Sequence, residues 1–239
     1  MRKILLASSS RLKGETFFSH MLVPFEAHLK TMNASYDAPL IFIPWAKSDP
    51  YSYADRAKEA FSVVNHPLRS IHEYKDPKEA IRTAAAVIVG GGNTFVLINK
   101  LHKTGVLPIL AARIEKGMPF LGASAGSNIA CPTICTTNDM PIVEPPSFKA
   151  LNIVPFQINP HYPLTEYHLP SESRDLRLKR YMEHNERAVL GLTNDCWLQI
   201  EGDKMLLKGE GESALFLPKK EKELVSAGTD LSYLLKRKQ

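Results

Sequence analysis

The amino-acid sequence predicts an α/β fold, in which a doubly wound, mostly parallel sheet carries helices on both faces and antiparallel edge strands near the C-terminus. Three observations lead to this prediction: short apolar runs that end in small or turn-forming residues, helical patterns between those runs, and a last third made of short strand-like runs. Strands that alternate with helices are typical of a parallel sheet, because each helix carries the chain back to the same edge.

Four apolar runs predict the strands of this sheet, since short continuous apolar runs suit strands that are covered on both faces. They span residues 3–7, 40–45, 85–89 and 119–122. Two amphipathic segments predict helices between the strands. The first covers 53–64, and the second covers 93–116 with a break near Gly105 and Pro108.

The last third of the chain predicts antiparallel strands added to the edge of the main sheet. Strand-like runs at 197–200, 204–208 and 214–217 are separated by turns at Gly202-Asp203 and at Gly209-Glu210-Gly211. No linker rich in Pro, Gly or Ser divides the sequence. We therefore expect one domain over residues 1–239.

Composition and charge exclude several classes of function. The 239 residues are 44% hydrophobic and 23% charged, as in an ordinary globular protein, and no apolar run approaches the roughly 18 residues of a membrane span. The net charge is +5. Lys and Arg are interleaved with Asp and Glu along the chain, and the only nearly pure basic run is 236–238. This pattern argues against nucleic-acid and membrane partners and is compatible with an acidic substrate.

The N-terminal run and the cysteines predict the compartment. The run at 4–7 is too short for the core of a signal peptide, so we expect a cytoplasmic protein. The three cysteines, Cys131, Cys135 and Cys196, are too few and too irregularly spaced for a disulfide framework or a zinc site. We expect buried free thiols, with no metal or cofactor.

The segment Gly122-Ala123-Ser124-Ala125-Gly126 carries the strongest signal for chemistry. It follows a predicted strand and precedes Ser127-Asn128-Ile129-Ala130, a plausible start of a helix. Small residues around a serine permit the tight strand–turn–helix bend of a nucleophile elbow. We therefore predict that Ser124 is a nucleophile. The first N–H groups of the helix would face the oxyanion that develops on the substrate's carbonyl oxygen.

A second loop, Gly90-Gly91-Gly92-Asn93-Thr94, follows another predicted strand. It matches neither of the glycine-rich phosphate-binding patterns, and the supply of an oxyanion-hole donor is its predicted role. A tight turn without a role in the site is the alternative. Serine hydrolases of the α/β type take one donor from such a loop and one from the residue after the nucleophile. Gly91 and Ala125 are the expected pair.

The base and the acid are less well defined. His161 follows an apolar stretch and an Asn-Pro turn signal, which places it on a loop at the sheet edge. Asp139 and Asp195 are both candidates for an acid that orients the imidazole, and spacing does not choose between them.

Four segments, in matching order and spacing, resemble peptidase E, the α-aspartyl dipeptidase family. The resemblance covers nearly the whole chain and is weakest around 30–80 and after about 200. The segments are 87–95, Gly122 to Gly126, 131–143 and Gln157 to His161.

The resemblance implies a metal-independent serine peptidase that removes N-terminal Asp from dipeptides, on a fold like that of the class I glutamine amidotransferases. It implies Ser124 as nucleophile, His161 as base and Asp139 as the third member of the triad. The Gly90 to Gly92 loop and Ala125 match the oxyanion hole, and Gly92 and Asn93 are expected to contact substrate.

The same resemblance implies a substrate-binding arginine in Glu172-Ser173-Arg174. A guanidinium group can hold a carboxylate with two hydrogen bonds, which suits the side chain of a substrate Asp. Arg174 and Arg177 are three residues apart, on one face of a helix that Ser171 or Ser173 is expected to cap. A solvated helix face is the alternative.

One position departs from the family pattern. The family has also been described with a Glu as third triad member, and Asn194 stands where that Glu is expected. Asn can orient a histidine, as it does in Cys-His-Asn sites. The third member is therefore Asp139, Asp195 or Asn194.

The sequence thus predicts a serine dipeptidase for Asp-X dipeptides that acts as a monomer or homodimer. Two rival hypotheses are a related hydrolase of other specificity, cyanophycinase-like or an esterase, and a catalytically inactive ligand-binding homologue. The departure at Asn194 is the only support for the inactive homologue.

Overall fold

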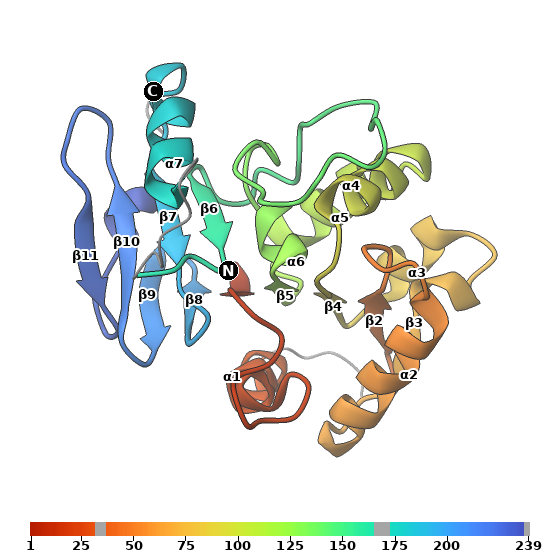
Figure 1. The fold of residues 1–239 in the computed structure, drawn as a ribbon. Coiled ribbons are helices and arrows are strands. Elements are labelled where there is room, and N and C mark those ends of the chain that lie inside the picture. The colour runs from red at the N-terminus through yellow and green to blue at the C-terminus, as the bar shows by residue number, and fades with distance from the viewer. Residues whose placement is uncertain (32–36, 165–172, 237–239) are drawn as a thin grey trace.

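A computed structural model describes residues 1–31, 37–164 and 173–236. It contains a central sheet with helices on both faces and a smaller second sheet toward the C-terminal part of the chain (Figure 1). The predicted fold class is confirmed. The expectation of one domain over 1–239 stays a prediction.

The central sheet has seven strands in the order β3-β2-β4-β5-β1-β8-β9. The first five are parallel, β8 pairs antiparallel with β1, and β9 pairs antiparallel with β8. The strands are β1 (Lys3–Ala7), β2 (Leu40–Ile43), β3 (Leu68–Ser70), β4 (Ala86–Val89), β5 (Phe120–Ala123), β8 (Cys196–Glu201) and β9 (Lys204–Gly209). The four predicted buried strands lie within one or two residues of their predicted bounds, and β3 was not predicted.

Alternating side chains of the parallel strands pack against helices on opposite faces. Leu5 and Phe42 pack with helices α1 and α2 in one buried cluster, whereas Ile4 and Ile41 pack with α3 to α6 in another. The helices are α1 (Ser19–Lys30), α2 (Pro50–Ala60), α3 (Pro77–Thr83), α4 (Thr94–Lys103), α5 (Val106–Glu115), α6 (Ala125–Asn128) and α7 (Arg174–Glu183). Burial on both faces explains why β2, β4 and β5 are apolar throughout and why β1 is apolar after Lys3.

A second sheet of four strands in the order β11-β10-β7-β6 was not predicted. Its strands are β6 (Gln157–Pro160), β7 (Val189–Leu192), β10 (Glu212–Phe216) and β11 (Glu223–Ser226). The prediction that the third C-terminal run joins the main sheet is therefore wrong, because β10 pairs with β7 and β11. Strands β6 and β7 are parallel, with Pro160 opposite Leu192.

Helix boundaries follow capping residues that the sequence contains. Helix α2 starts at Pro50, three residues before the predicted start, because the Asp49 side chain accepts hydrogen bonds from the N–H groups of Tyr51 and Ser52. The break in the second predicted helix lies at Gly105, whose φ is 68°. Pro108 lies in the first turn of α5. The N–H groups of a first turn have no acceptor within the helix, so a proline there removes no helical hydrogen bond.

The termini of α7 bear on two further predictions. Ser173 is the cap, since its side chain accepts from the Leu176 N–H. Ser171, Glu172 and the last two residues of the basic run 236–238 lie outside the described residues.

In the part of the chain that the structure describes, no single helix is long and apolar enough to cross a membrane. Helices α4 and α5, bent by 95°, reach that length and composition only together.

Candidate active site

The candidate site lies at the carboxyl ends of the strands, where open α/β sheets bind ligands. Loops after β1, β2, β4, β5 and β6 line a cleft of about 750 Å³ that contains both Ser124 and His161. Its wall also includes three predicted residues, Gly91, Gly92 and Asn93. Loops distant in the sequence therefore meet at one edge.

Ser124 occupies the tight turn between β5 and α6, as predicted, with φ 54° and ψ −110°. The turn requires small neighbours, because a Cβ at Gly126 would overlap with the carbonyl oxygen of Val89. The buried Ser127 hydroxyl secures the turn by donating to the carbonyl oxygens of Ala7 and Gly122, at 2.6 and 3.0 Å. A strained backbone held this firmly is a feature of functional sites.

His161 is also held in a left-handed conformation, with φ 56°, directly after β6. Its Nε2 lies 2.8 Å from the Ser124 Oγ, the distance of a nucleophile–base hydrogen bond. Ser8, which sequence reasoning missed, fixes its backbone: the Ser8 hydroxyl accepts from the His161 N–H at 2.7 Å and donates to the Leu192 carbonyl oxygen at 2.8 Å. The structure thus brings Ser124 and His161 together.

Asn194 contacts the other ring nitrogen of the His161 imidazole. Its Oδ1 lies 2.6 Å from His161 Nδ1. An amide oxygen accepts only, so Nδ1 carries the proton in this contact and Nε2 is left to accept from the serine hydroxyl. Of the three candidates for third member, Asn194 is the one with the required contact.

Asp139 and Asp195 have other surroundings. The hydrogen bonds found for the Asp139 carboxylate go to Thr94 and Thr137, and among the described residues none goes to His161. Asp195 is exposed and its backbone oxygen accepts from the Glu210 N–H. The expectation that Asp139 orients the imidazole is therefore not met in this geometry.

The oxyanion-hole prediction needs a correction at one residue. The Gly91 N–H donates to the buried Tyr53 hydroxyl at 2.9 Å, so it does not point at the nucleophile. Within the described residues no hydrogen bond is found for the N–H of Gly92 or of Ala125. Gly92, with φ 139°, and Ala125 are therefore the available donors. The Gly91 N–H instead ties the loop to Tyr53.

The Tyr53 hydroxyl supports this loop, and sequence reasoning missed it. Burial raises the pKa of Tyr53 to about 12, so the hydroxyl stays neutral at all ordinary pH values. In the Tyr53→Phe variant the buried Gly91 N–H loses its acceptor. We expect the free energy of unfolding to fall by about 1–3 kcal/mol and kcat/KM to fall by about tenfold. Urea titration and peptide kinetics measure both, and the exposed Tyr51→Phe is the matched control.

Three cations line the cleft near Tyr53. Lys47 and Arg56 lie over the Tyr53 ring, 5.7 and 5.4 Å from its centroid, and Arg11 lies on the loop after β1. No ion pair with a carboxylate is found for any of them in the described part of the chain. The described lining of the cleft therefore carries an excess of positive charge, which the sequence showed only as a net excess over the whole chain.

Arg174 and Asn93 are placed differently from the predictions for substrate contacts. Arg174 is absent from the described lining of the cleft, and its Nη1 donates to the Asn159 Oδ1 at 3.2 Å. Asn93 lines the cleft, but its side chain also caps α4 by accepting from the Val96 N–H and donates to the Met140 carbonyl oxygen. Both side chains have structural partners.

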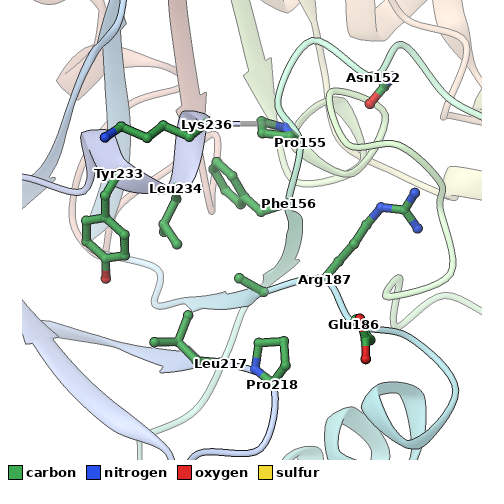
Figure 2. Close-up of a pocket in the computed structure, with 11 residues that line it drawn as sticks. Asn152, Pro155, Phe156, Glu186, Arg187, Leu217, Pro218, Tyr233, Leu234 and Lys236 are labelled. Carbon is green, nitrogen blue, oxygen red and sulfur yellow. The ribbon is translucent and has the colours of Figure 1, made fainter. Parts of the chain in front are cut away.

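The remaining predicted features lie elsewhere. All three cysteines are free, but Cys135 is exposed and not buried as expected. Within residues 1–31, 37–164 and 173–236, no three His, Cys, Asp or Glu side chains are grouped to hold a metal ion. A second cavity of about 670 Å³ is lined mainly by apolar side chains, with Arg187 and Lys236 among its residues (Figure 2). The described residues that line it include neither Ser124 nor His161.

Comparison with known proteins identifies relatives over the whole length. The model of peptidase family S51 matches residues 4–208. Peptidase E of Streptomyces coelicolor is 41% identical, covering 97% of this chain and 94% of its own. A "Probable alpha-aspartyl dipeptidase" of Drosophila melanogaster is 37% identical, covering 99% and 98%. The crystal structure of a peptidase from an acI-B1 Actinobacterium shares the fold, with a TM-score of 0.71 at 15% identity and coverage of 97% and 96%.

Proposed function

The chain belongs to peptidase family S51 and is a serine peptidase, and we propose that it hydrolyses dipeptides whose first residue is aspartate. The observation that carries the proposal is the hydrogen-bonded series Ser124–His161–Asn194, beside the N–H groups of Gly92 and Ala125, for which no hydrogen bond is found among the described residues. The proposed substrate, a small acidic dipeptide, agrees with the excess of cations among the described residues that line the cleft. The proposed compartment is the cytoplasm, without nucleic-acid or membrane partners.

The proposed reaction follows from these contacts. Ser124 Oγ attacks the carbonyl carbon of the Asp residue while His161 Nε2 takes the hydroxyl proton, and Asn194 keeps Nδ1 as the donor. The N–H groups of Gly92 and Ala125 bind the oxyanion. His161 then gives the proton to the departing amine, which leaves an aspartyl ester on Ser124. Water, deprotonated by His161, attacks the ester. His161 then returns that proton to Ser124 Oγ as the ester bond breaks and aspartate is released.

Release of free aspartate tests this proposal directly. The purified protein is incubated in EDTA with Asp-Leu, Glu-Leu, Ala-Leu and N-acetyl-Asp-Leu. We expect rapid cleavage of Asp-Leu alone. Cleavage of an ester or of a β-linked Asp polymer instead would favour the related hydrolase of other specificity, and no turnover by the folded protein would favour the inactive homologue.

Arg174 is the residue that the family resemblance assigns to the substrate Asp side chain. If it holds that carboxylate, Arg174→Ala removes a charge-assisted contact, and kcat/KM for Asp-Leu falls by about 10- to 200-fold. Arg177→Ala, on an exposed turn of the same helix, is the matched control. Unchanged kinetics for Arg174→Ala together with a large loss for Arg56→Ala would transfer the role to the cation over Tyr53.

A further inference from the structure

We propose that Asp139, instead of completing the triad, binds the free α-ammonium group of the substrate's N-terminal residue. The inference rests on the proposed function and deepens it, because it assigns the requirement for an unblocked N-terminus to one carboxylate.

The Asp139 carboxylate is anchored through one oxygen. Oδ2 accepts from the Thr94 N–H at 2.7 Å, the Thr94 hydroxyl at 2.6 Å and the Thr137 hydroxyl at 3.1 Å. No hydrogen bond is found for Oδ1 within the described residues, and Asp139 is half-buried in the wall of the cleft. Oδ1 is therefore left without a described protein partner that a ligand would have to displace.

The loop that carries Asp139 is hydrogen-bonded both to the segment that holds His161 and to the glycine-rich loop after β4. Asn138 Nδ2 donates to the carbonyl oxygen of Pro160, the residue before His161, at 2.8 Å. The Met140 carbonyl oxygen accepts from Asn93 Nδ2 at 2.9 Å, beside the oxyanion loop. Asp139 is therefore held between the loop of the base and the loop of the oxyanion donors.

This position suits a group that binds an α-amine. In a peptide the α-nitrogen is attached to the carbon next to the scissile carbonyl, so its binding partner has to lie close to the oxyanion hole. Thr94, which donates to Asp139, is two residues from Gly92, and two residues span at most about 7 Å. Asp139 Oδ2, 2.7 Å from the Thr94 nitrogen, therefore lies within about 10 Å of the Gly92 N–H.

The charges of the cleft leave the amine one acidic partner. Of the described residues that line the cleft, Asp139 is the only one with a carboxylate, while Arg11, Lys47 and Arg56 are cations. A zwitterionic dipeptide would meet the cations with its carboxylates and Asp139 with its ammonium group. The N-terminus of α4 additionally favours a negative charge at this position.

The test compares Asp-Leu with succinyl-leucine, which is the same molecule without the α-amino group. We expect the wild type to prefer Asp-Leu by about 100-fold in kcat/KM. Asp139→Asn should lower kcat/KM for Asp-Leu by about 10- to 100-fold, mostly through KM, and change the value for succinyl-leucine by less than about threefold. Glu144→Gln, which removes an exposed acid from the same loop, should keep the preference.

Two kinetic outcomes of Asp139→Asn would overturn the inference: an equal loss of kcat/KM on both substrates, which places Asp139 in the chemistry or the fold, or no loss on either substrate. Asparagine retains an oxygen for the Thr94 N–H, and a thermal unfolding scan checks that the variant is folded. Calorimetric binding of aspartate and succinate to Ser124→Ala gives a readout without turnover. Selective binding of aspartate that is lost in Ser124→Ala/Asp139→Asn would uphold the inference even if the wild type cleaved no peptide, and equal or absent binding of both acids would reject it.

Discussion

Replacing Ser124 with alanine should lower kcat for Asp-Leu by at least about 10⁴-fold and leave the protein folded. The hydroxyl 2.8 Å from His161 Nε2 is the nucleophile of the proposed reaction, and without it no acyl-enzyme forms. Alanine retains the Cβ and hence the strained turn, so we expect the free energy of unfolding to change by less than about 1 kcal/mol.

The measurement combines aspartate release with labelling by a fluorophosphonate that reacts with activated serines. Peptide mapping should find the label on Ser124 in the wild type and nowhere in the Ser124→Ala variant. A Ser124→Ala protein that still releases aspartate at more than about 1% of the wild-type rate would disprove the assignment of the nucleophile. Urea unfolding of both proteins separates loss of chemistry from loss of fold.

Four parallel strands of the central sheet could be predicted because they are buried on both faces and therefore read as continuous apolar runs, whereas β3, Leu68-Arg69-Ser70, contains no such run. The second sheet could not, because β7 and β10 are also short apolar runs and nothing local specifies which sheet each one joins. Pairing partners and register depend on contacts distant in the sequence. The start of α2 at Pro50 was readable from Asp49-Pro50, a capping signal that the prediction overlooked.

The residues of the candidate site likewise include some that the sequence could predict and some that it could not. Ser124 and His161 stand in recognisable local contexts, a turn between small residues and an Asn-Pro loop. The partner of His161 depends on the register of β6 and β7, which places Pro160 opposite Leu192 and so brings Asn194 to the imidazole. The assignment of Gly91 failed for a similar reason, since the hydroxyl that occupies its N–H belongs to Tyr53 on α2.

Replacing Asn194 with leucine should lower kcat by about 10²-fold or more. Leucine has a similar volume but no acceptor for the His161 Nδ1 proton, so the imidazole loses both its orientation and its preferred tautomer. Substrate binding does not use this contact, and KM should change by less than about threefold. Asn194→Asp retains an acceptor oxygen at the same distance and should stay within about threefold of the wild-type kcat or exceed it.

The two competing acids provide the matched comparison for Asn194. If Asp195 oriented the imidazole, Asp195→Asn would cause the large loss in kcat and Asn194→Leu would be nearly silent. If Asp139 did so, Asp139→Asn would lower kcat equally for substrates with and without an α-amine. Because the carboxamide oxygen lies 2.6 Å from Nδ1 while the hydrogen bonds of Asp139 go to Thr94 and Thr137, only Asn194→Leu is expected to reduce kcat without changing substrate preference.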